Sequence, residues 1–464
     1  MNSDTSLVHL FYPLSVAVIG ASSDRKKIGY EVLSNLKRFK GDLYAVNPSA
    51  EKIQGKRAYR SVLDIGATVD LAVISVPPKN VCSVVEQCGK KGVRTIVILT
   101  AGFREAGNAA AENEIAGMAS GYGMRVIGPN SVGIINNDND LNATFVMASK
   151  KGSIAFVSQS GALSAAVIYK TVYEDIGFSK FVSLGNMADV GFSEMISYLE
   201  SDKSTKSIAL YMERVDDGKA FVQAARRCSQ KKPIIVLKSG RSDAGRRAAS
   251  SHTGSLSGTD SIYDAAFSQA GVIRAKSIEE MLDFSKVFTL DGPKGNNVCV
   301  LTNAGGPGIL ATDACESTGL CVPELPIKTQ EKLRKILPEY AAVRNPVDTI
   351  AQARYRETYK SIRILEDEPC VDAILSVIVI PTFGSIGYST HAKALIDGWR
   401  KTKPLVTCFM SGELAIPSRR MMLAHKIPSY KTPERAALSL GALWRYTRWY
   451  NEHTDMDQDI SVRG

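Results

Sequence analysis

One histidine of this sequence stands in a setting that suits a nucleophile. The segment SGRSDAGRRAASSHTGSLSG, which follows Lys238, is rich in Gly, Ser, Ala and Arg and has no apolar periodicity, so it predicts a long loop over residues 239–259. His252 lies near its middle, among small residues that let another group approach. Imidazole is nucleophilic at neutral pH and can carry a phosphoryl group covalently. An ordinary surface histidine is the competing interpretation.

A nucleophilic imidazole needs a carboxylate that orients the ring and stabilises its positive charge. Glu213 ends the apolar run SIALYM, which predicts a strand, so we expect its side chain at the carboxyl edge of a parallel sheet. A surface acid at a strand end is the alternative. The other histidines stand in less suggestive contexts: His9, His391, His425 and His453.

Three segments combine an apolar strand, a turn of small residues and the start of a helix. Small residues let the backbone approach an anion, and a helix N-terminus supplies N–H groups and positive potential. Two of these turns predict phosphate-binding residues: Ser158, Gln159, Ser160, Gly161, Asn303, Gly305 and Gly306. A helix cap or a tight turn explains each of them equally well when it is taken alone.

The third such turn begins at Gly20 and lacks the glycine spacing of NAD-binding proteins. The second strand ends at Asn47, where an NAD-binding unit would place an acid that holds the ribose. A nucleotide with an additional phosphate, such as CoA, fits better, with Lys26 as the candidate cation. The turn and two loops expected at the same edge give these candidate cofactor-binding residues: Gly20, Ala21, Ser22, Lys26, Gly29, Asn47, Ser75, Val76, Pro77, Thr100, Ala101 and Gly102.

The elements that position these residues alternate between apolar strands and helical patterns, which is typical of parallel α/β sheets. We expect a doubly wound, Rossmann-like domain over residues 1–148, with strands at 15–20, 43–47, 71–76, 95–100 and 125–128. A flavodoxin-like domain follows over 149–290, with strands at 153–158, 181–185, 207–212, 234–238 and 272–275. The third α/β unit covers 291–464, with strands at 298–303, 373–380 and 405–409 and a final helix from Pro433 to about Tyr446.

Composition narrows the choice of partners. The net charge of +10 favours an anionic partner, but no basic patch interleaved with aromatic residues indicates nucleic acid. No stretch reaches the ~18 apolar residues that a membrane span needs, and the N-terminus does not have the pattern of a signal peptide. The eight cysteines are scattered without CxxC or metal spacing, so we expect reduced thiols, no metal site and a cytoplasmic protein.

Taken together, the motifs resemble one family over residues 12–450. They are SVAVIGASSDRKKIGYEVLSNL, AVNP, SVPP, ILTAGF, IGPNSVGIIN, SIAFVSQSGALSAAV, FVSLGNMADV and RAASSHTGSLSG. The chain is similar to the α subunits of ADP-forming acetyl-CoA synthetases, within the succinyl-CoA synthetase superfamily. The resemblance implies that His252 is phosphorylated, that Glu213 hydrogen-bonds it, and that Ser160 and Gly161 hold the phosphate.

The same resemblance implies that the first domain binds CoA through a set that includes Gly20, Ser22, Lys26, Pro48, Ser75, Pro77 and Asn130. The third domain resembles the family's ligase-CoA domain, which is also flavodoxin-like, with its glycine-rich turn near the active site. The implied reaction is reversible: acetyl-CoA, ADP and phosphate give acetate, CoA and ATP through acyl-phosphate and phosphohistidine intermediates. The preferred acyl group, ADP against GDP and the physiological direction stay open.

The chain departs from fused family members in one respect. Those members carry an ATP-grasp domain, and no segment of that kind follows the third domain up to Gly464. We therefore expect ADP or ATP with Mg²⁺ to bind a separate β subunit, in an α2β2 assembly, with His252 carrying the phosphoryl group to it. A CoA-binding regulatory protein with an inactive site and an NAD-linked dehydrogenase are the competing interpretations.

Overall fold

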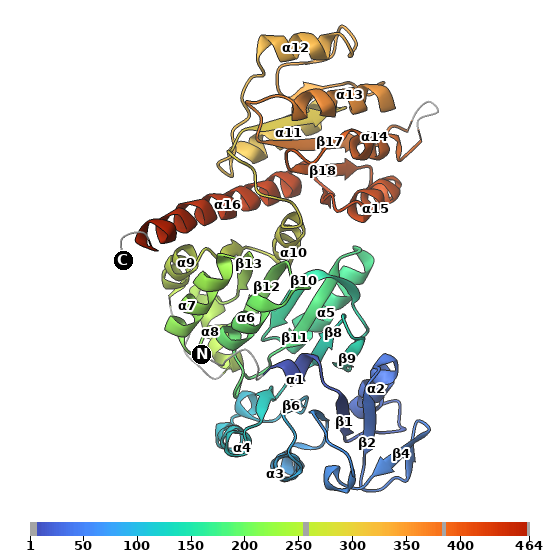
Figure 1. The fold of residues 1–464 in the computed structure, drawn as a ribbon, viewed down its shortest axis with the longest axis vertical. Coiled ribbons are helices and arrows are strands. Elements are labelled where there is room, and N and C mark those ends of the chain that lie inside the picture. Colours follow the sequence, from blue (N-terminus) through green and yellow to red (C-terminus); the bar gives the residue numbers. More distant parts are fainter. Residues whose placement is uncertain (1–6, 254–258, 383–386, 462–464) are drawn as a thin grey trace. The chain divides into compact units, whose positions relative to one another are not determined.

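The computed structural model describes residues 7–253, 259–382 and 387–461, without the side chains of 249–253 and 455–461 (Figure 1). Its contacts divide the chain into two compact units, residues 1–278 and 279–464. Each unit is described by itself. We expected boundaries after residues 148 and 290, so the structure joins the first two predicted domains into one unit.

The first sheet of unit 1 has the strand order β3-β4-β2-β1-β5-β6-β7, and only β3 is antiparallel to its neighbour. Its strands are β1 (Ser15–Ile19), β2 (Asp42–Val46), β3 (Lys52–Ile53), β4 (Lys56–Tyr59), β5 (Leu71–Ile74), β6 (Thr95–Ile98) and β7 (Arg125–Ile127). Its helices are α1 (Val8–Phe11), α2 (Ile28–Asn35), α3 (Val81–Lys91) and α4 (Ala109–Gly121), with short 3-10 turns at Leu36–Arg38, Val62–Asp64, Pro78–Asn80 and Arg104–Ala106 (η4). Without β3, this is the Rossmann order, which confirms the first predicted fold.

The second sheet of unit 1 has the order β14-β13-β12-β10-β11-β8-β9. Its strands are β8 (Gly133–Asn136), β9 (Leu141–Thr144), β10 (Lys150–Ser158), β11 (Gly177–Ser183), β12 (Ser207–Met212), β13 (Ile234–Lys238) and β14 (Ile273–Ala275). Its helices are α5 (Gly161–Tyr173), α6 (Phe192–Ser201), α7 (Gly218–Ser229), α8 (Asp243–Thr253) and α9 (Asp260–Gln269). The hairpin of β8 and β9 joins this sheet through antiparallel pairing of β8 with β11, so residues 133–144 belong to the second sheet and not to the first.

Helix α8 replaces most of the loop that we predicted over residues 239–259. Its sequence has no apolar stripe, but Ala and Arg are strong helix formers and need no such stripe to form a turn. Ser242 supports the start of the helix: its Oγ accepts the Gly245 N–H at 3.1 Å and its carbonyl accepts the Arg246 N–H at 2.8 Å. The expectation of a loop therefore fails for residues 243–253.

Unit 2 contains one parallel sheet in the order β16-β15-β17-β18-β19. Its strands are β15 (Val298–Thr302), β16 (Val347–Asp348), β17 (Ala373–Val379), β18 (Leu405–Met410) and β19 (Ser429–Tyr430). Its helices are α10 (Ile278–Val287), α11 (Gly305–Glu316), α12 (Ile327–Arg334), α13 (Tyr355–Glu366), α14 (Thr390–Gly398), α15 (Ile416–Ala424) and α16 (Pro433–Ser461), with a 3-10 turn at Gly412–Ala415. Helix α16 ends well beyond the expected Tyr446.

The five parallel strands of the second sheet and the sheet of unit 2 follow the same plan. In chain order, β10 to β14 and β15 to β19 both give the arrangement 2-1-3-4-5, which is the flavodoxin-like order. This confirms two flavodoxin-like folds after the Rossmann-like one. Strands β13 and β15 are buried along their whole length, as continuous apolar runs in parallel sheets predict.

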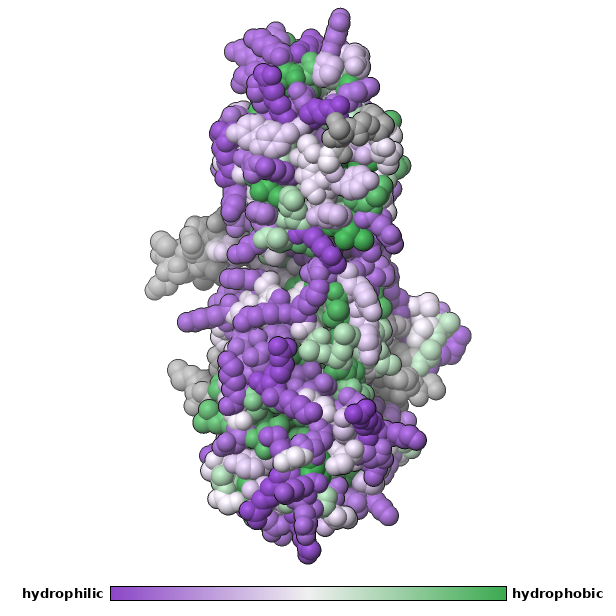
Figure 2. Space-filling model, turned by 90° about the vertical axis from the view of Figure 1, so that its right-hand side faces the viewer, coloured by the Kyte–Doolittle hydropathy of each residue, from purple (hydrophilic) through white to green (hydrophobic). Residues whose placement is uncertain are grey.

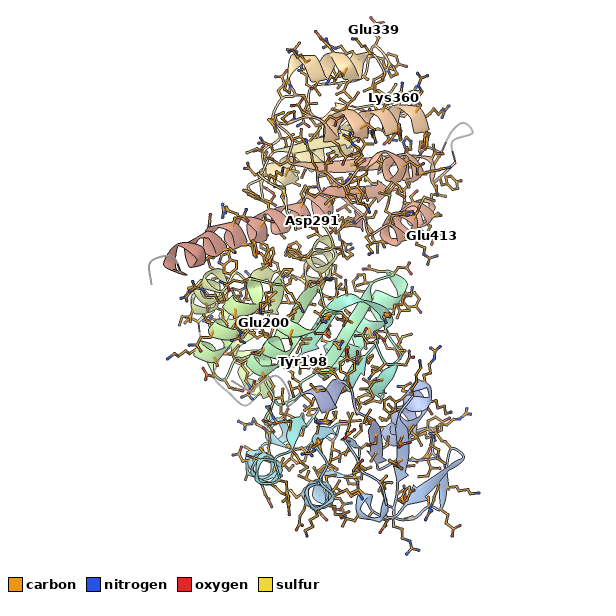
Figure 3. The ribbon with its side chains drawn as sticks, in the orientation of Figure 1. Tyr198, Glu200, Asp291, Glu339, Lys360 and Glu413 are labelled. Atoms are coloured by element: carbon orange, nitrogen blue, oxygen red, sulfur yellow. The ribbon has the colours of Figure 1, made fainter. Side chains whose placement is uncertain are left out.

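Hydrophilic residues cover much of the face drawn in Figure 2, and many long side chains project outward from the ribbon in Figure 3. Glu200, which lies near the end of helix α6 in Figure 3, accepts hydrogen bonds from Arg227 at 2.7 Å and Lys231 at 2.6 Å, and so ties α6 to the end of α7. None of the helices that the structure describes is both long and apolar enough to cross a membrane.

Candidate active site

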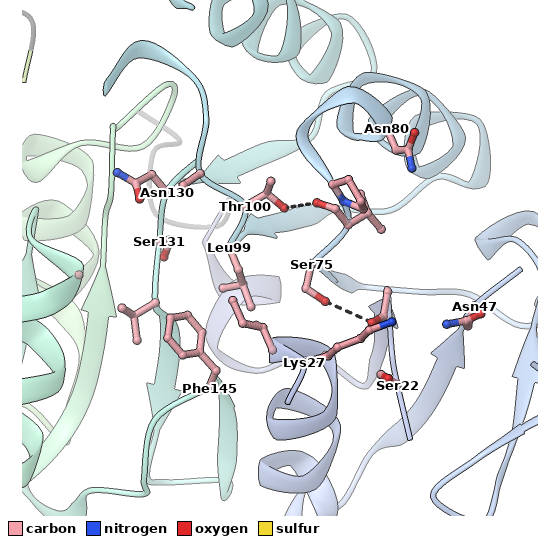
Figure 4. Close-up of a pocket in the computed structure, with 18 of the residues that line it drawn as sticks. Ser22, Lys27, Asn47, Ser75, Asn80, Leu99, Thr100, Asn130, Ser131 and Phe145 are labelled. Atoms are coloured by element: carbon pink, nitrogen blue, oxygen red, sulfur yellow. Dashed lines mark hydrogen bonds between the residues drawn. The ribbon is translucent and has the colours of Figure 1, made fainter. Parts of the chain in front are cut away.

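A cavity of about 890 Å³ opens at the carboxyl edge of the first sheet of unit 1 (Figure 4). Figure 4 shows Ser22, Lys27 and Asn47 on one side and Asn130, Ser131 and Phe145 on the other. This is the edge at which ligands of open α/β sheets bind. The lining comes from the turn after β1, the start of α2, the loops after β2, β5, β6 and β7, the residue after β9 and the start of α5.

Two glycines shape the turn after β1. Gly20 has φ +92°, and a Cβ there would lie 2.6 Å from the Ser75 carbonyl oxygen. A Cβ on Gly29, in the first turn of α2, would lie 2.0 Å from the Gly20 carbonyl oxygen. Because neither position tolerates a side chain, the start of α2 packs directly on the turn, and residues 27–29 line the cavity.

Most of the predicted cofactor-binding residues line this cavity. The exceptions are Ala21, Lys26 and Gly102. Lys27, the residue before α2, lines the cavity in place of the predicted Lys26. The side chain of Asn47 supports the turn, since it donates to the Ala21 carbonyl and accepts from the Ser49 N–H, each at 2.9 Å.

The turn between β10 and α5 reaches the same cavity. The Ser158 hydroxyl accepts the Ser160 N–H at 3.1 Å and donates to the Ser160 carbonyl at 3.0 Å, which fixes the turn. Ser160 caps α5 by accepting the Leu163 N–H at 3.3 Å. Gly161 and Ala162 line the cavity, so the predicted phosphate turn and the predicted CoA site share one opening.

A small polar cleft lies beside this turn and contains Glu213. Its volume is about 30 Å³, and it is lined by Arg104, Glu105, Asn130, Gln159, Gly185, Asn186, Glu213 and Arg214. The Gln159 side-chain oxygen accepts the backbone N–H groups of Glu213 at 2.5 Å and Arg214 at 3.0 Å. Gln159 thus joins the predicted phosphate turn to the predicted acid, which is only 8% exposed.

Asn186 connects this cleft to the loop after β6. Its side-chain nitrogen donates to Glu105 at 2.6 Å and to Glu112 at 2.8 Å. Burial raises the pKa of Glu105, but the hydrogen bonds from Asn186 and from nearby backbone N–H groups outweigh burial and hold that pKa below its usual value. Glu105 is therefore a carboxylate at neutral pH.

His252 lies in the last turn of α8, and its side chain is outside the described part of the structure. Helix α8 contacts η4. Arg104 and Glu105 of η4 line the cleft together with Glu213. The helix that carries His252, α8, thus contacts the 3-10 turn η4, which lines the cleft.

The glycine-rich turn of unit 2 is built like the turn after β10. The Thr302 hydroxyl accepts the Ala304 N–H at 3.1 Å and donates to the Ala304 carbonyl at 3.0 Å. The Asn303 side chain exchanges two 2.9 Å hydrogen bonds with the backbone of Val379, at the end of β17. Gly305 and Gly306 are exposed at the start of α11, so their N–H groups are accessible.

Sequence reasoning missed several residues of this site. Phe145 carries no motif, and Asn186 lies within the motif FVSLGNMADV but was given no role there; both reach the site through the chain's long-range folding. Lys27 could have been predicted from the sequence, because it directly precedes the first residue of α2 and so lies closer to that helix N-terminus than Lys26 does. Among the described residues, no group of three or more His, Cys, Asp and Glu side chains is arranged to hold a metal ion.

Three family models match successive parts of the chain. Residues 14–137 match a CoA binding domain, residues 151–288 a succinyl-CoA ligase like flavodoxin domain, and residues 298–452 a ligase-CoA domain. The chain is 47% identical to the subunit alpha of ADP-forming acetate–CoA ligase II of Pyrococcus furiosus, over 94% of this chain and 97% of that subunit.

A more distant relative and a solved structure widen this picture. The chain is 35% identical to the ADP-forming 4-hydroxybutyrate–CoA ligase of Nitrosopumilus maritimus, over 95% of this chain and 64% of that protein. It also matches the structure of a dinucleotide forming acetyl-coenzyme A synthetase 1 of Candidatus Korarchaeum cryptofilum in complex with phosphate and ADP. That match has a TM-score of 0.92 and 37% sequence identity, over 97% of this chain and 98% of the other.

Proposed function

This chain belongs to the family of α subunits of ADP-forming acetate–CoA ligases, and from that premise we propose that it carries the CoA and phosphohistidine steps of such an enzyme. Phosphate attacks the thioester carbonyl of an acyl-CoA, and CoA leaves and takes a proton. The His252 nitrogen then attacks the phosphorus of the acyl-phosphate, and the carboxylate leaves. A β-phosphate oxygen of ADP finally attacks the phosphohistidine and forms ATP.

The single observation that carries this proposal is the shared opening of the two predicted binding turns. The cavity of about 890 Å³ runs from Gly20 and Lys27 to Gly161, so a CoA whose phosphates lie at the start of α2 can present its thioester at the start of α5. Both helix N-termini offer N–H groups to anionic oxygens, which suits a reaction that depends on positioning and on charge stabilisation.

Glu213 supports the role of His252. It is buried, and Gln159 holds its backbone beside the turn at the start of α5. A carboxylate in this position would orient an imidazole ring and stabilise the positive charge that the ring gains when it attacks phosphorus.

The nucleotide step belongs to a partner subunit in this proposal. The Pyrococcus furiosus relative is a subunit alpha, and this chain spans 97% of its length. We therefore expect a β subunit of ATP-grasp type that binds ADP or ATP with Mg²⁺, in an α2β2 assembly located in the cytoplasm.

Acetate is the expected acid, because relatives that are 47% and 42% identical to the chain are acetate–CoA ligases. The 4-hydroxybutyrate ligase among the relatives makes longer acids the second choice. Leu99, Val132 and Phe145 give the cavity apolar walls, and Val132 lies beside Gly161, where the acyl group would lie.

Labelled phosphate tests the proposal. The chain, expressed with its β subunit, should incorporate label from γ-labelled ATP in an acid-labile, base-stable form, and His252→Ala should abolish this. His425→Ala, which changes an exposed histidine of unit 2, is the matched control and should label normally. Equal labelling of the His252→Ala chain would disprove the assignment. A screen of acids for CoA-dependent turnover would identify the substrate.

A further inference from the structure

Arg214 is a buried arginine of the cleft whose carboxylate neighbour is exposed. It is 9% exposed and follows Glu213 at the end of β12. One guanidinium nitrogen donates to the Asn186 carbonyl at 3.1 Å. The other lies 3.3 Å from a carboxylate oxygen of Asp216, whose side chain is 57% exposed. An exposed carboxylate is largely screened by water, so it neutralises the guanidinium weakly.

Other arginines of unit 1 are paired differently. Arg104 lines the same cleft, but its Nε lies 2.8 Å from Glu112, whose side chain is 1% exposed. Arg125 forms a two-pronged pair with Asp189, with distances of 2.9 and 3.1 Å. Since a buried guanidinium is costly unless it is neutralised, the cleft would gain from an anion that completes the pairing of Arg214.

The cleft also offers a neutral donor to such an anion. The Gln159 side-chain oxygen is occupied by two backbone N–H groups, whereas its amide nitrogen donates to the Met187 sulfur at 3.4 Å. Sulfur is a weak acceptor, so this N–H group would bond better to an anionic oxygen. Gln159 is also the residue before Ser160, the cap of α5, and it lines the cleft together with Arg214.

Size restricts the ligand. The cleft has a volume of about 30 Å³, against about 890 Å³ for the larger cavity. It therefore suits the oxygen atoms of a small anion such as a phosphoryl group better than an acyl chain, a base or a ribose. The carboxylates of Glu105 and Glu112 also lie close, but both are engaged by Asn186 and by backbone N–H groups, which reduces their repulsion of an anion.

We infer that Arg214 binds the phosphoryl group during the reaction, both as inorganic phosphate and as it passes to His252. This inference rests on the proposed function and adds a residue to it. The planar guanidinium would bond two phosphoryl oxygens at once, while the N–H groups at the start of α5 take the remaining ones. Glu213 then serves the imidazole and Arg214 the phosphate, although the two residues are adjacent in the chain.

Steady-state kinetics of the complex with the β subunit test this role. In the direction that consumes acyl-CoA, ADP and inorganic phosphate, Arg214→Gln should raise the KM for phosphate roughly ten- to a hundredfold, the effect of losing a charged hydrogen bond. The KM values for CoA ester and ADP should change by less than about threefold. Arg214→Lys keeps the positive charge but cannot bond two oxygens at once. Its KM for phosphate should lie between those of the unchanged chain and of Arg214→Gln.

Arg125→Gln is the matched control, because it removes a half-buried arginine whose fork is already filled by Asp189. Its KM for phosphate should stay close to that of the unchanged chain. A normal phosphate KM in Arg214→Gln, or an equal rise in all three KM values, would overturn the inference. Should Arg214→Gln fail to fold, a normal phosphate KM in Arg214→Lys would do the same. Absence of label on His252 in the unchanged complex would instead refute the proposed function itself.

Discussion

The turns after β10 in unit 1 and after β15 in unit 2 are built by the same interactions. In each, a hydroxyl at the strand end holds the backbone two residues later, through Ser158 and Ser160 in one and Thr302 and Ala304 in the other. In each, the residue after the hydroxyl residue has a side-chain amide that bonds the backbone at the end of another strand. Gln159 bonds the backbone after β12, and Asn303 bonds the backbone at the end of β17.

The two turns differ in the residues that come after β12 and β17. Glu213 and Arg214 follow β12, whereas Ile380 and Pro381 follow β17. The first turn thus has charged side chains from this strand end beside a helix N-terminus, whereas the equivalent positions of the second turn supply none. The carboxylate near the second turn belongs to Asp348, whose oxygen would lie 3.4 Å from a Cβ on Gly305. In the proposed function both turns serve as scaffolds for an anion, and the contrast predicts that the chemistry depends on residues supplied by the neighbouring strand.

The largest expected effect of this difference concerns the carboxylate. Glu213→Gln keeps the size of the side chain and removes the charge that would stabilise the imidazolium of His252. We expect phosphorylation of the chain by ATP, in complex with its β subunit, to slow by roughly 10²- to 10⁴-fold, which is typical of lost acid–base or charge assistance. Rapid quench with labelled ATP measures this rate.

Ile380→Val, at the topologically equivalent place in unit 2, is the control and should leave the rate within about twofold. A normal rate in Glu213→Gln would mean that the charge beside the first turn has no part in the chemistry. The distinction between the two turns would then rest on structure alone.

The second effect separates the two units by their response to acid. His391 of α14 is 1% exposed, its Nδ1 lies 2.9 Å from the Thr358 hydroxyl, and its Nε2 has no partner among the described residues. Burial lowers its pKa from 6.5 to about 4. Between pH 6.5 and about 4, this histidine is protonated in the unfolded chain but neutral in the folded unit. The free energy of unfolding of unit 2 should therefore fall by roughly 3 kcal/mol as the pH drops from above 6.5 towards 4.

Urea unfolding at about pH 7 and about pH 4.5, on either side of the ordinary histidine pKa, checks this expectation. All three tryptophans, Trp399, Trp444 and Trp449, lie in unit 2, so their fluorescence follows that unit. His391→Gln should flatten the pH dependence, because glutamine does not titrate. An undiminished loss of stability in this variant would assign the acid response to other groups.

The sequence predicted the scaffold better than the site. Continuous apolar runs located the buried strands, such as β13, because a strand covered on both faces of its sheet has apolar side chains on both faces. Helix α8 was missed, since a helix without an apolar stripe has no periodic signal. The pairing of β8 with β11 was missed because it depends on contacts far apart in the chain. The same reason hid Asn186, which reaches the cleft from the loop after β11.

Comparable costs should follow from removing the hydroxyl in either turn. Ser158→Ala and Thr302→Val each leave a backbone N–H without its partner, at Ser160 and Ala304 respectively. Because both hydroxyl residues are fully buried, we expect each change to lower the free energy of unfolding of its unit by about 1–3 kcal/mol. Native-state hydrogen exchange measures unit 1, and tryptophan fluorescence in urea measures unit 2. A cost in only one unit would show that the two turns are not equivalent scaffolds.

The smallest expected effect concerns the helix caps. Ser160 accepts the N–H of Leu163, the third helical residue of α5, and Ser160→Ala should cost about 1 kcal/mol in unit 1. Ala304 has the extended conformation of a cap residue, with φ −153° and ψ 120°, but no side-chain oxygen. A serine there meets Pro307 at the third helical position, which has no N–H to give.

Ala304→Ser alone should therefore change the stability of unit 2 by less than about 0.5 kcal/mol, despite the preference for serine at this position. When Pro307→Ala restores the missing N–H, adding Ala304→Ser should stabilise that variant by about 1 kcal/mol. Tryptophan fluorescence in urea measures the free energy of unfolding of unit 2 in the unchanged chain, in each single variant and in the double variant. A full gain from Ala304→Ser in the presence of Pro307 would contradict the idea that the proline removes the need for a cap. A coupling confined to the Pro307→Ala background would show that the proline, and not the turn before it, makes a side-chain cap dispensable in α11.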